Sequence, residues 1–356
     1  MTDIINIDDW NTIFNKIPKI INDHTYDTIC NTNNCIDRDN YMTLKFRLTT
    51  LMKDIGNFEY INHATGDQAV VHAVMLSRKY LGIKHIYVVK EAFHGITLKY
   101  FREGILNFEG ISIFEFELNC LERAIENCRD NSLLIIEPFL FFANYGNDGI
   151  KKIKHIVTTA KKNGVLILFD EIRSGVFSTG PFLFSQKCLP IDIDFICFSK
   201  GLALGVPTSV LAIKAGIFLR NIIKNEDIFK SCMAISDVAM QRSNDLLAYY
   251  LDDSSTFNKR LSSVTEKISK YFGSFANTSI VNQVNIIGLC CIFTFNENVK
   301  KAKLRLLWLH MLSRNIEVRP IEGNLWIFNF ALDSSDEEFA IVRDELKVAM
   351  ELIDNN

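Results

Sequence analysis

The sequence lacks the cysteine and histidine patterns that would indicate a disulfide framework or a metal site. Nine cysteines are spread over 356 residues, their number is odd, and no two of them form a Cys-x-x-Cys pair. We therefore expect reduced, mostly buried thiols in a cytoplasmic protein. No His-Glu-x-x-His segment or cluster of histidines and cysteines occurs, so we predict no bound metal.

Long apolar runs, a basic leader and a strong excess of one charge are also missing. The longest apolar run, residues 133–143, is interrupted by Glu137 and Pro138 and is too short to cross a bilayer. The first residues are acidic and do not resemble a secretory signal peptide. At a net charge of −3, we expect neither nucleic acid nor a membrane as a partner.

Glycine-dependent motifs are absent as well. With 17 glycines in all, the chain has no Gly-x-Gly-x-x-Gly after a strand, no phosphate-binding P-loop and no Gly-x-Ser-x-Gly turn. These absences argue against a dinucleotide-binding protein, a P-loop nucleotide hydrolase and an α/β-hydrolase.

Alternating strand and helix patterns are what the sequence does contain. Short apolar runs separated by helical stretches predict an α/β fold with a mostly parallel sheet flanked by helices. The last hundred or so residues instead predict antiparallel strands with helices on one face, a smaller α+β C-terminal domain. We expect an N-terminal segment at 1–45 that joins the small domain or a dimer contact, a large domain at 46–254 and the small domain at 255–356.

The most informative stretch is residues 165–201, where two apolar runs each end in polar or charged residues. The first ends at Asp170 and Glu171, and the second at Ser199 and Lys200. Residues that follow such strands lie at the ligand-binding edge of a parallel sheet. A lysine and a carboxylate there suit pyridoxal phosphate, because the amine forms a Schiff base with the aldehyde and the carboxylate keeps the pyridine nitrogen protonated. Ordinary polar caps on two core strands are the alternative.

Three other junctions carry residues of the same kind. Residues 65–68, Thr-Gly-Asp-Gln, open a helical pattern and offer amides and a hydroxyl to a phosphate, or form an ordinary helix cap. Residues 93–95, Phe-His-Gly, offer an aromatic ring to stack on a pyridine, or a core phenylalanine beside a turn. The acid of residues 137–138, Glu-Pro, closes a third strand, where it either supports a site or caps a turn.

Together these segments resemble the class III pyridoxal-phosphate aminotransferases, the ω-aminotransferase group of the fold-type I superfamily. The similarity lies in the order and spacing of TGDQA at 65–69, AFHGITL at 92–98, IIEP at 135–138, LFDEIRSG at 168–175, FSTG at 177–180 and DFICFSKGLALGVPTSVLAIK from 194. The resemblance implies an aminotransferase that moves an amino group between an amine or amino acid and an aldehyde or keto compound. It also implies a ping-pong reaction through pyridoxamine phosphate and a homodimer with its site at the subunit interface.

The resemblance further implies which residues hold the cofactor. Lys200 forms the Schiff base and moves the substrate proton, and Asp170 pairs with the pyridinium nitrogen. Phe93 and Ile172 lie against the two faces of the ring. The remaining cofactor-binding residues are Gly66 and Asp67 at the phosphate, and His94 and Glu137 near the ring.

The chain departs from the family pattern where substrates are held. Residues 140–142, Leu-Phe-Phe, stand in place of Gln-Gly-Glu, Ser178 replaces an arginine, and Ile327 replaces the arginine that grips a substrate carboxylate. We therefore expect an apolar amine or aldehyde as substrate rather than the glutamate/2-oxoglutarate pair, with Arg173 as a positive charge whose place is open.

Two points stay open from the sequence. The threonine that a partner subunit supplies to the phosphate corresponds to Met233, with Ser231 or Ser236 as substitutes. The same scaffold also accommodates a pyridoxal-phosphate mutase, epimerase or decarboxylase, or a family member without catalytic activity.

Overall fold

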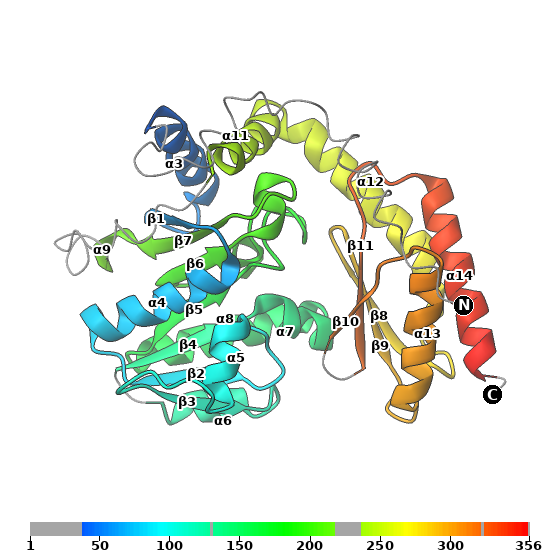
Figure 1. The fold of residues 1–356 in the computed structure, drawn as a ribbon, viewed down its shortest axis with the longest axis horizontal. Coiled ribbons are helices and arrows are strands. Elements are labelled where there is room, and N and C mark those ends of the chain that lie inside the picture. Colours follow the sequence, from blue (N-terminus) through cyan, green and yellow to red (C-terminus); the bar gives the residue numbers. More distant parts are fainter. Residues whose placement is uncertain (1–37, 129–130, 218–235, 322–323, 355–356) are drawn as a thin grey trace.

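The computed structural model describes residues 38–128, 131–217, 236–321 and 324–354, which form two sheets with helices packed on them (Figure 1). A seven-stranded sheet has the order β1-β7-β6-β5-β4-β2-β3, and a four-stranded sheet has the order β10-β11-β9-β8. Of the expected N-terminal segment, residues 1–37 lie outside the described part of the chain.

Most of the large sheet is parallel. Strands β2 to β6 run in one direction, β7 is antiparallel to β6, and β1 is antiparallel to β7, so β1 again points the same way as β6. The strands are β1 (Phe58–His63), β2 (His85–Val89), β3 (Ser112–Phe116), β4 (Ser132–Ile136), β5 (Leu166–Asp170), β6 (Phe195–Phe198) and β7 (Ser209–Lys214).

Both faces of this sheet are covered, which explains why its central strands are apolar throughout. Leu134 and Ile136 of β4 belong to one buried cluster and Leu133 and Ile135 to another, as the alternation of side chains along a strand requires. The helices of this part are α3 (Arg38–Met52), α4 (Gly66–Leu81), α5 (Ile96–Arg102), α6 (Leu121–Glu126), α7 (Pro138–Tyr145), α8 (Asn147–Lys162), α9 (Ala215–Ile217) and α11 (Asp237–Asp252), with the short 3-10 turns η1 (Phe184–Cys188) and η2 (Lys200–Ala203).

The small sheet is antiparallel, as expected, and its helices lie on one side of it (Figure 1). Its core is aromatic, with Phe272, Phe293 and Phe328 packed at ring-centroid distances between 5.3 and 6.4 Å. The elements are α12 (Ser254–Phe272), η4 (Gly273–Phe275), β8 (Val281–Ile287), β9 (Cys290–Phe295), α13 (Lys301–Ser313), β10 (Arg319–Ile321), β11 (Leu325–Asn329) and α14 (Asp336–Asp354).

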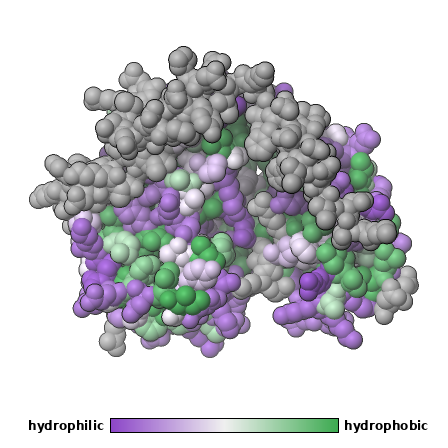
Figure 2. All heavy atoms as spheres, in the orientation of Figure 1, coloured by the Kyte–Doolittle hydropathy of each residue, from purple (hydrophilic) through white to green (hydrophobic). Residues whose placement is uncertain are grey.

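Helices α11 and α12 follow one another along one side of the molecule and connect the two sheets (Figure 1). Helix α7 lies between the two sheets (Figure 1). The Asn285 amide of β8 donates to the Ala143 carbonyl of α7 at 3.0 Å. On the face seen in Figure 2, apolar and polar side chains are interspersed. No helix among the described residues is both long and apolar enough to cross a bilayer.

Strand β1, helix α5 and helix α7 were not predicted from the sequence. The polar residues Glu59 and Asn62 obscure the strand pattern of β1 at the edge of the sheet. In α7, residues 139–143 are all buried, so no amphipathic period reveals the helix.

Candidate active site

The candidate site lies where the carboxyl ends of the parallel strands meet at one edge of the large sheet. Asp170 ends β5, and Lys200 follows the neighbouring strand β6. Glu137 follows β4, and residues 93–94 follow β2. Because β1 runs in the same direction, residues 65–66 lie at this edge too. The fold thus brings all the predicted site segments to the edge at which open α/β sheets bind ligands.

Asp170 is buried and held from two sides. Its Oδ2 atom lies 2.8 Å from Nδ1 of His94, and Oδ1 accepts the Ile172 N–H at 3.2 Å. Because a carboxylate accepts hydrogen bonds, we assign the His94 proton to Nδ1. The other ring nitrogen of His94 is buried without a partner among the described residues. The pair therefore presents an oriented negative charge that suits a cationic ring nitrogen.

Lys200 occupies a strained turn directly after β6. Its φ of +47° lies in the left-handed region, which non-glycine residues rarely adopt. Two hydroxyls hold this turn, since Ser199 Oγ donates to the Thr208 carbonyl at 2.5 Å and Ser209 Oγ donates to the Phe198 carbonyl at 3.1 Å. Backbone strain that the surroundings maintain in this way is concentrated at functional positions in proteins.

The buried thiol of Cys290, on β9 of the small sheet, is affected by two cations of the candidate site. Burial raises the pKa of the Cys290 thiol to about 12, and the positive charges of Arg173 and Lys200 act in the opposite direction. The small sheet is therefore within the electrostatic range of this edge of the large sheet.

The predicted phosphate segment forms the N-terminus of α4. Thr65 is the N-cap, and its side chain and that of Gln68 form a reciprocal capping box. A Cβ on Gly66 would lie only 2.6 Å from the Ile172 side chain, so glycine allows the two segments to approach closely. The Asp67 carboxylate accepts the amide N–H of Thr97 at 3.0 Å and its hydroxyl at 2.6 Å. What residues 66 and 67 offer a ligand is therefore their backbone amides.

Glu137 links Phe93 to Arg173. One carboxylate oxygen accepts the Phe93 N–H at 3.1 Å, and the other lies 3.3 Å from Nη1 of Arg173. Phe93 is 52% exposed, so its aromatic ring is available at the site. The place of Arg173 was left open by the sequence. The available signal was its position next to Ile172, in the segment that follows the end of β5.

The positions that depart from the family pattern have structural roles here. Residues 140–142 are buried in the core around α7, and Ile327 is 2% exposed in the same core. The hydroxyl of Ser178 donates to the Arg173 carbonyl at 3.0 Å. Ser236 caps α11 by accepting the Ala239 amide at 3.1 Å, whereas Ser231 and Met233 lie outside the described residues.

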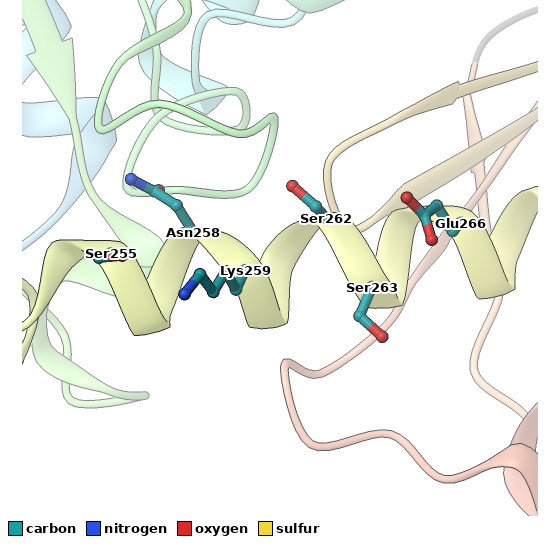
Figure 3. Close-up of a pocket in the computed structure, with 6 residues that line it drawn as sticks. All are labelled: Ser255, Asn258, Lys259, Ser262, Ser263 and Glu266. Atoms are coloured by element: carbon teal, nitrogen blue, oxygen red, sulfur yellow. The ribbon is translucent and has the colours of Figure 1, made fainter.

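A hollow elsewhere on the surface is separate from this site. Six residues line it, and the close-up shows them along α12 (Figure 3): Ser255, Asn258, Lys259, Ser262, Ser263 and Glu266. All six belong to one helix, and none of them is a predicted site residue. The hollow is therefore not the place where the strand-end residues converge.

The sequence is similar to those of known transaminases over part of its length. It is 29% identical over 174 residues to the acetylornithine aminotransferase of Methanopyrus kandleri, covering 44% of this chain and 41% of that protein. It is 24% identical over 231 residues to the diaminobutyrate–2-oxoglutarate transaminase of Halalkalibacterium halodurans, covering 58% of this chain and 52% of that protein. The match thus spans about half the length of these relatives. No family model matches the chain.

The fold is similar over a larger part of the chain. A taurine:2-oxoglutarate aminotransferase from Bifidobacterium kashiwanohense, solved with pyridoxal phosphate and glutamate, superposes with a TM-score of 0.70 at 15% identity. That comparison covers 93% of this chain and 85% of the other. The chain is therefore similar in sequence to several transaminases over part of its length, and it shares the α/β fold of a solved aminotransferase over most of it, in line with the resemblance of its segments to the class III aminotransferases.

Proposed function

We propose that this protein is an aminotransferase that uses pyridoxal phosphate, the cofactor implied by its family, to move an amino group from an amine or amino acid to an aldehyde or keto compound. The observation that supports this most directly is the convergence of the Asp170–His94 pair and the strained Lys200 turn at the ends of adjacent strands. The family relationship alone would be compatible with a site that had lost these residues.

The residues at this edge suit the cofactor in charge and in the polar groups that they offer. The buried Asp170 carboxylate suits a protonated ring nitrogen, and the ring nitrogen of His94 that lacks a partner among the described residues leaves a polar atom for a ligand or water. The exposed ring of Phe93 is available for stacking on a pyridine. The amides at the start of α4 suit a phosphate, because they have no partners within the helix and lie at the positive end of its dipole.

When bound, pyridoxal phosphate would supply an aldehyde that takes up and releases the amino group, and a ring that withdraws electrons from the reacting carbon. In our proposal the Lys200 amine holds the cofactor and then moves a proton at the reacting carbon of the substrate. Asp170 keeps the positive charge at the ring nitrogen, and His94 orients Asp170. Phe93 and Ile172 confine the ring between them, and Glu137 holds the backbone of Phe93.

We also propose that two copies of the chain form a homodimer around this site. Phe93, Ile96 and Tyr100 are 52%, 46% and 40% exposed, although they lie on and directly before α5, next to the candidate site. Apolar side chains gathered in this way suit burial against a second subunit. Sedimentation of the purified protein would show a monomer if this part of the proposal were wrong.

The test of the function is spectroscopic and uses two lysine variants. The purified protein is loaded with pyridoxal phosphate, mixed with amino donors, and followed by the absorbance of the bound cofactor. We expect amino donors to convert the bound cofactor to its amino form in the wild type and, at the same rate, in Lys151→Ala. In Lys200→Ala this conversion should be about 10²–10⁴-fold slower or absent. Lys151 is a suitable control because its side chain is 81% exposed on α8.

Other outcomes point to the alternatives. One such outcome is turnover of a substrate although no donor converts the bound cofactor to its amino form. That result would favour a mutase, epimerase or decarboxylase, which needs no second amino acceptor. Failure to bind the cofactor at all would favour a family member that has lost catalysis. Either result would overturn the aminotransferase proposal.

A further inference from the structure

Arg173 is a half-buried cation at the candidate site that the proposed mechanism does not use. It follows Ile172 in the segment after β5, and its side chain is 25% exposed. Its guanidinium carbon lies 5.8 Å from the centre of the Phe139 ring. The Ser178 hydroxyl donates to its backbone carbonyl at 3.0 Å. The arginine is thus held at its backbone and packed beside its side chain.

Glu137 orients this guanidinium without saturating it. The ion pair joins one oxygen of Glu137 to Nη1 at 3.3 Å, while the other oxygen of Glu137 accepts the Phe93 N–H. A guanidinium carries five N–H donors in a planar fork that matches a carboxylate in bidentate fashion. Among the described residues Arg173 has this one ion pair, so further N–H groups of its fork are left for another acceptor.

Ile327 of the small sheet contributes no charge to this region. It is apolar and 2% exposed, in the core that it shares with Phe139. Arg173 and Lys200, in contrast, follow the carboxyl ends of the neighbouring parallel strands β5 and β6. The guanidinium therefore belongs to the same edge of the sheet as the amine that we assign to the reacting carbon.

We infer that Arg173 binds the carboxylate of the substrate, and that this carboxylate is attached at or next to the carbon that bears the amino group. The inference rests on the proposed function, because it takes Lys200 as the group that works at that carbon. It assigns the substrate to the short-chain 2- or 3-amino acids and their oxo acids. An amine without a carboxylate near its amino group would not use Arg173 in this way.

Equilibrium binding of a simple carboxylate tests this without turnover. Propionate is titrated into the cofactor-loaded protein by calorimetry, with 1-propanol as the neutral analogue. We expect Arg173→Gln to weaken propionate binding by about 10- to 100-fold, since hydrogen bonds to charged groups have this strength. Arg173→Lys should recover part of the loss, because it restores the charge but not the planar fork. Arg314→Gln, at the C-terminal end of α13, should bind propionate as the wild type does.

A second measurement compares L-alanine with ethylamine as donors, again by the absorbance of the bound cofactor. We expect the preference for alanine over ethylamine to fall by about the same factor in Arg173→Gln as propionate binding does. Unchanged propionate binding in Arg173→Gln would overturn the inference. Conversion of ethylamine but not of alanine by the wild type would also overturn it. A change in Arg173→Gln that is confined to the affinity for pyridoxal phosphate would overturn it as well.

The two proposals fail in different ways. If no donor changes the cofactor absorbance while propionate binding still depends on Arg173, the carboxylate site stands and the aminotransferase proposal fails. Circular dichroism shows whether Arg173→Gln folds. If it does not, Arg173→Lys provides the comparison. Propionate binding as tight as in the wild type would then count against a role for the guanidinium fork.

Discussion

Asp170 and Glu171 are consecutive carboxylates that the fold places in different environments. Asp170 faces His94 at the ligand edge, with one oxygen 2.8 Å from the imidazole. Glu171 points into the core, where it accepts the backbone N–H groups of Phe184 and Ser185, the latter at 2.8 Å. One residue is thereby available to a cofactor, and the other joins the end of β5 to the turn η1.

The buried Glu171 should make stability depend on pH. Burial raises the pKa of its carboxyl from 4.5 to about 7, against the hydrogen bonds that favour the charged form. The folded state therefore binds this proton more tightly than the unfolded chain does. The resulting stabilisation is complete below about pH 4.5, and it is lost as the pH rises through about 7.

We expect the free energy of unfolding to fall by roughly 3 kcal/mol from this group between about pH 4.5 and 8. Urea unfolding at a series of pH values measures it, with Glu171→Gln as the comparison. The stability of the wild type relative to the variant should fall as the pH rises, because glutamine cannot lose a proton. A relative stability that rises with pH would show that the hydrogen-bonded anion is the favoured form.

Among the helices, α4 combines a structural cap with the proposed phosphate site at its N-terminus. The Thr65 hydroxyl accepts the Gln68 amide at 3.2 Å, and the Gln68 side chain accepts the Thr65 amide at 3.3 Å. These bonds satisfy donors that would otherwise face solvent, and they hold the amides of residues 66 and 67 in place. Asp253 caps α12 in a similar way by accepting the Thr256 amide at 3.0 Å.

This pair of caps separates a structural effect from a ligand effect. We expect Thr65→Ala and Asp253→Ala each to lower the free energy of unfolding by about 0.5–2 kcal/mol, as lost N-caps do. Only Thr65→Ala should also weaken pyridoxal-phosphate binding, measured by fluorescence titration. Equal cofactor affinity in the two variants would remove α4 from the proposed phosphate site.

At the scale of the whole molecule, the small sheet meets the large one through a tight contact between backbones. The Leu289 amide, in the turn between β8 and β9, donates to the Ser178 carbonyl at 2.9 Å. A Cβ on the neighbouring Gly288 would lie 2.6 Å from backbone atoms of residues 178–180. This turn therefore positions Cys290 and the rest of β9 relative to the loop that follows Arg173.

We expect Gly288→Ala to disrupt this contact. The substitution places a Cβ against rigid backbone at a φ of +55°, so it combines a clash with left-handed strain. Gly104→Ala is the matched control, because its φ is +72° and nothing lies within 4 Å of the added Cβ. Thermal and urea unfolding should show Gly288→Ala to be less stable than the control by about 1–3 kcal/mol. Equal stability of the two variants would show that the contact adjusts without cost.

Local patterns along the chain were enough to predict the class of fold and several segments that meet at one edge of the large sheet. Buried parallel strands require continuous apolar runs, so β4, β5 and β6 were recognisable before any packing was known. Glu137, Asp170 and Lys200 follow these three strands. They were candidate site residues because residues after such strands lie at a ligand-binding edge. The order of these segments along the chain was also enough to indicate a resemblance to the class III aminotransferases.

Contacts between the strand ends, in contrast, became visible only in the folded chain. Hydrogen bonds from His94 to Asp170 and from Phe93 to Glu137 join residues that are 76 and 44 positions apart, a separation that no local pattern encodes. The location of Arg173 beside Glu137 likewise depends on how distant elements pack. The chemistry of the strand ends is a local property of the chain, whereas the shape and charge of the substrate side arise from packing between the two sheets.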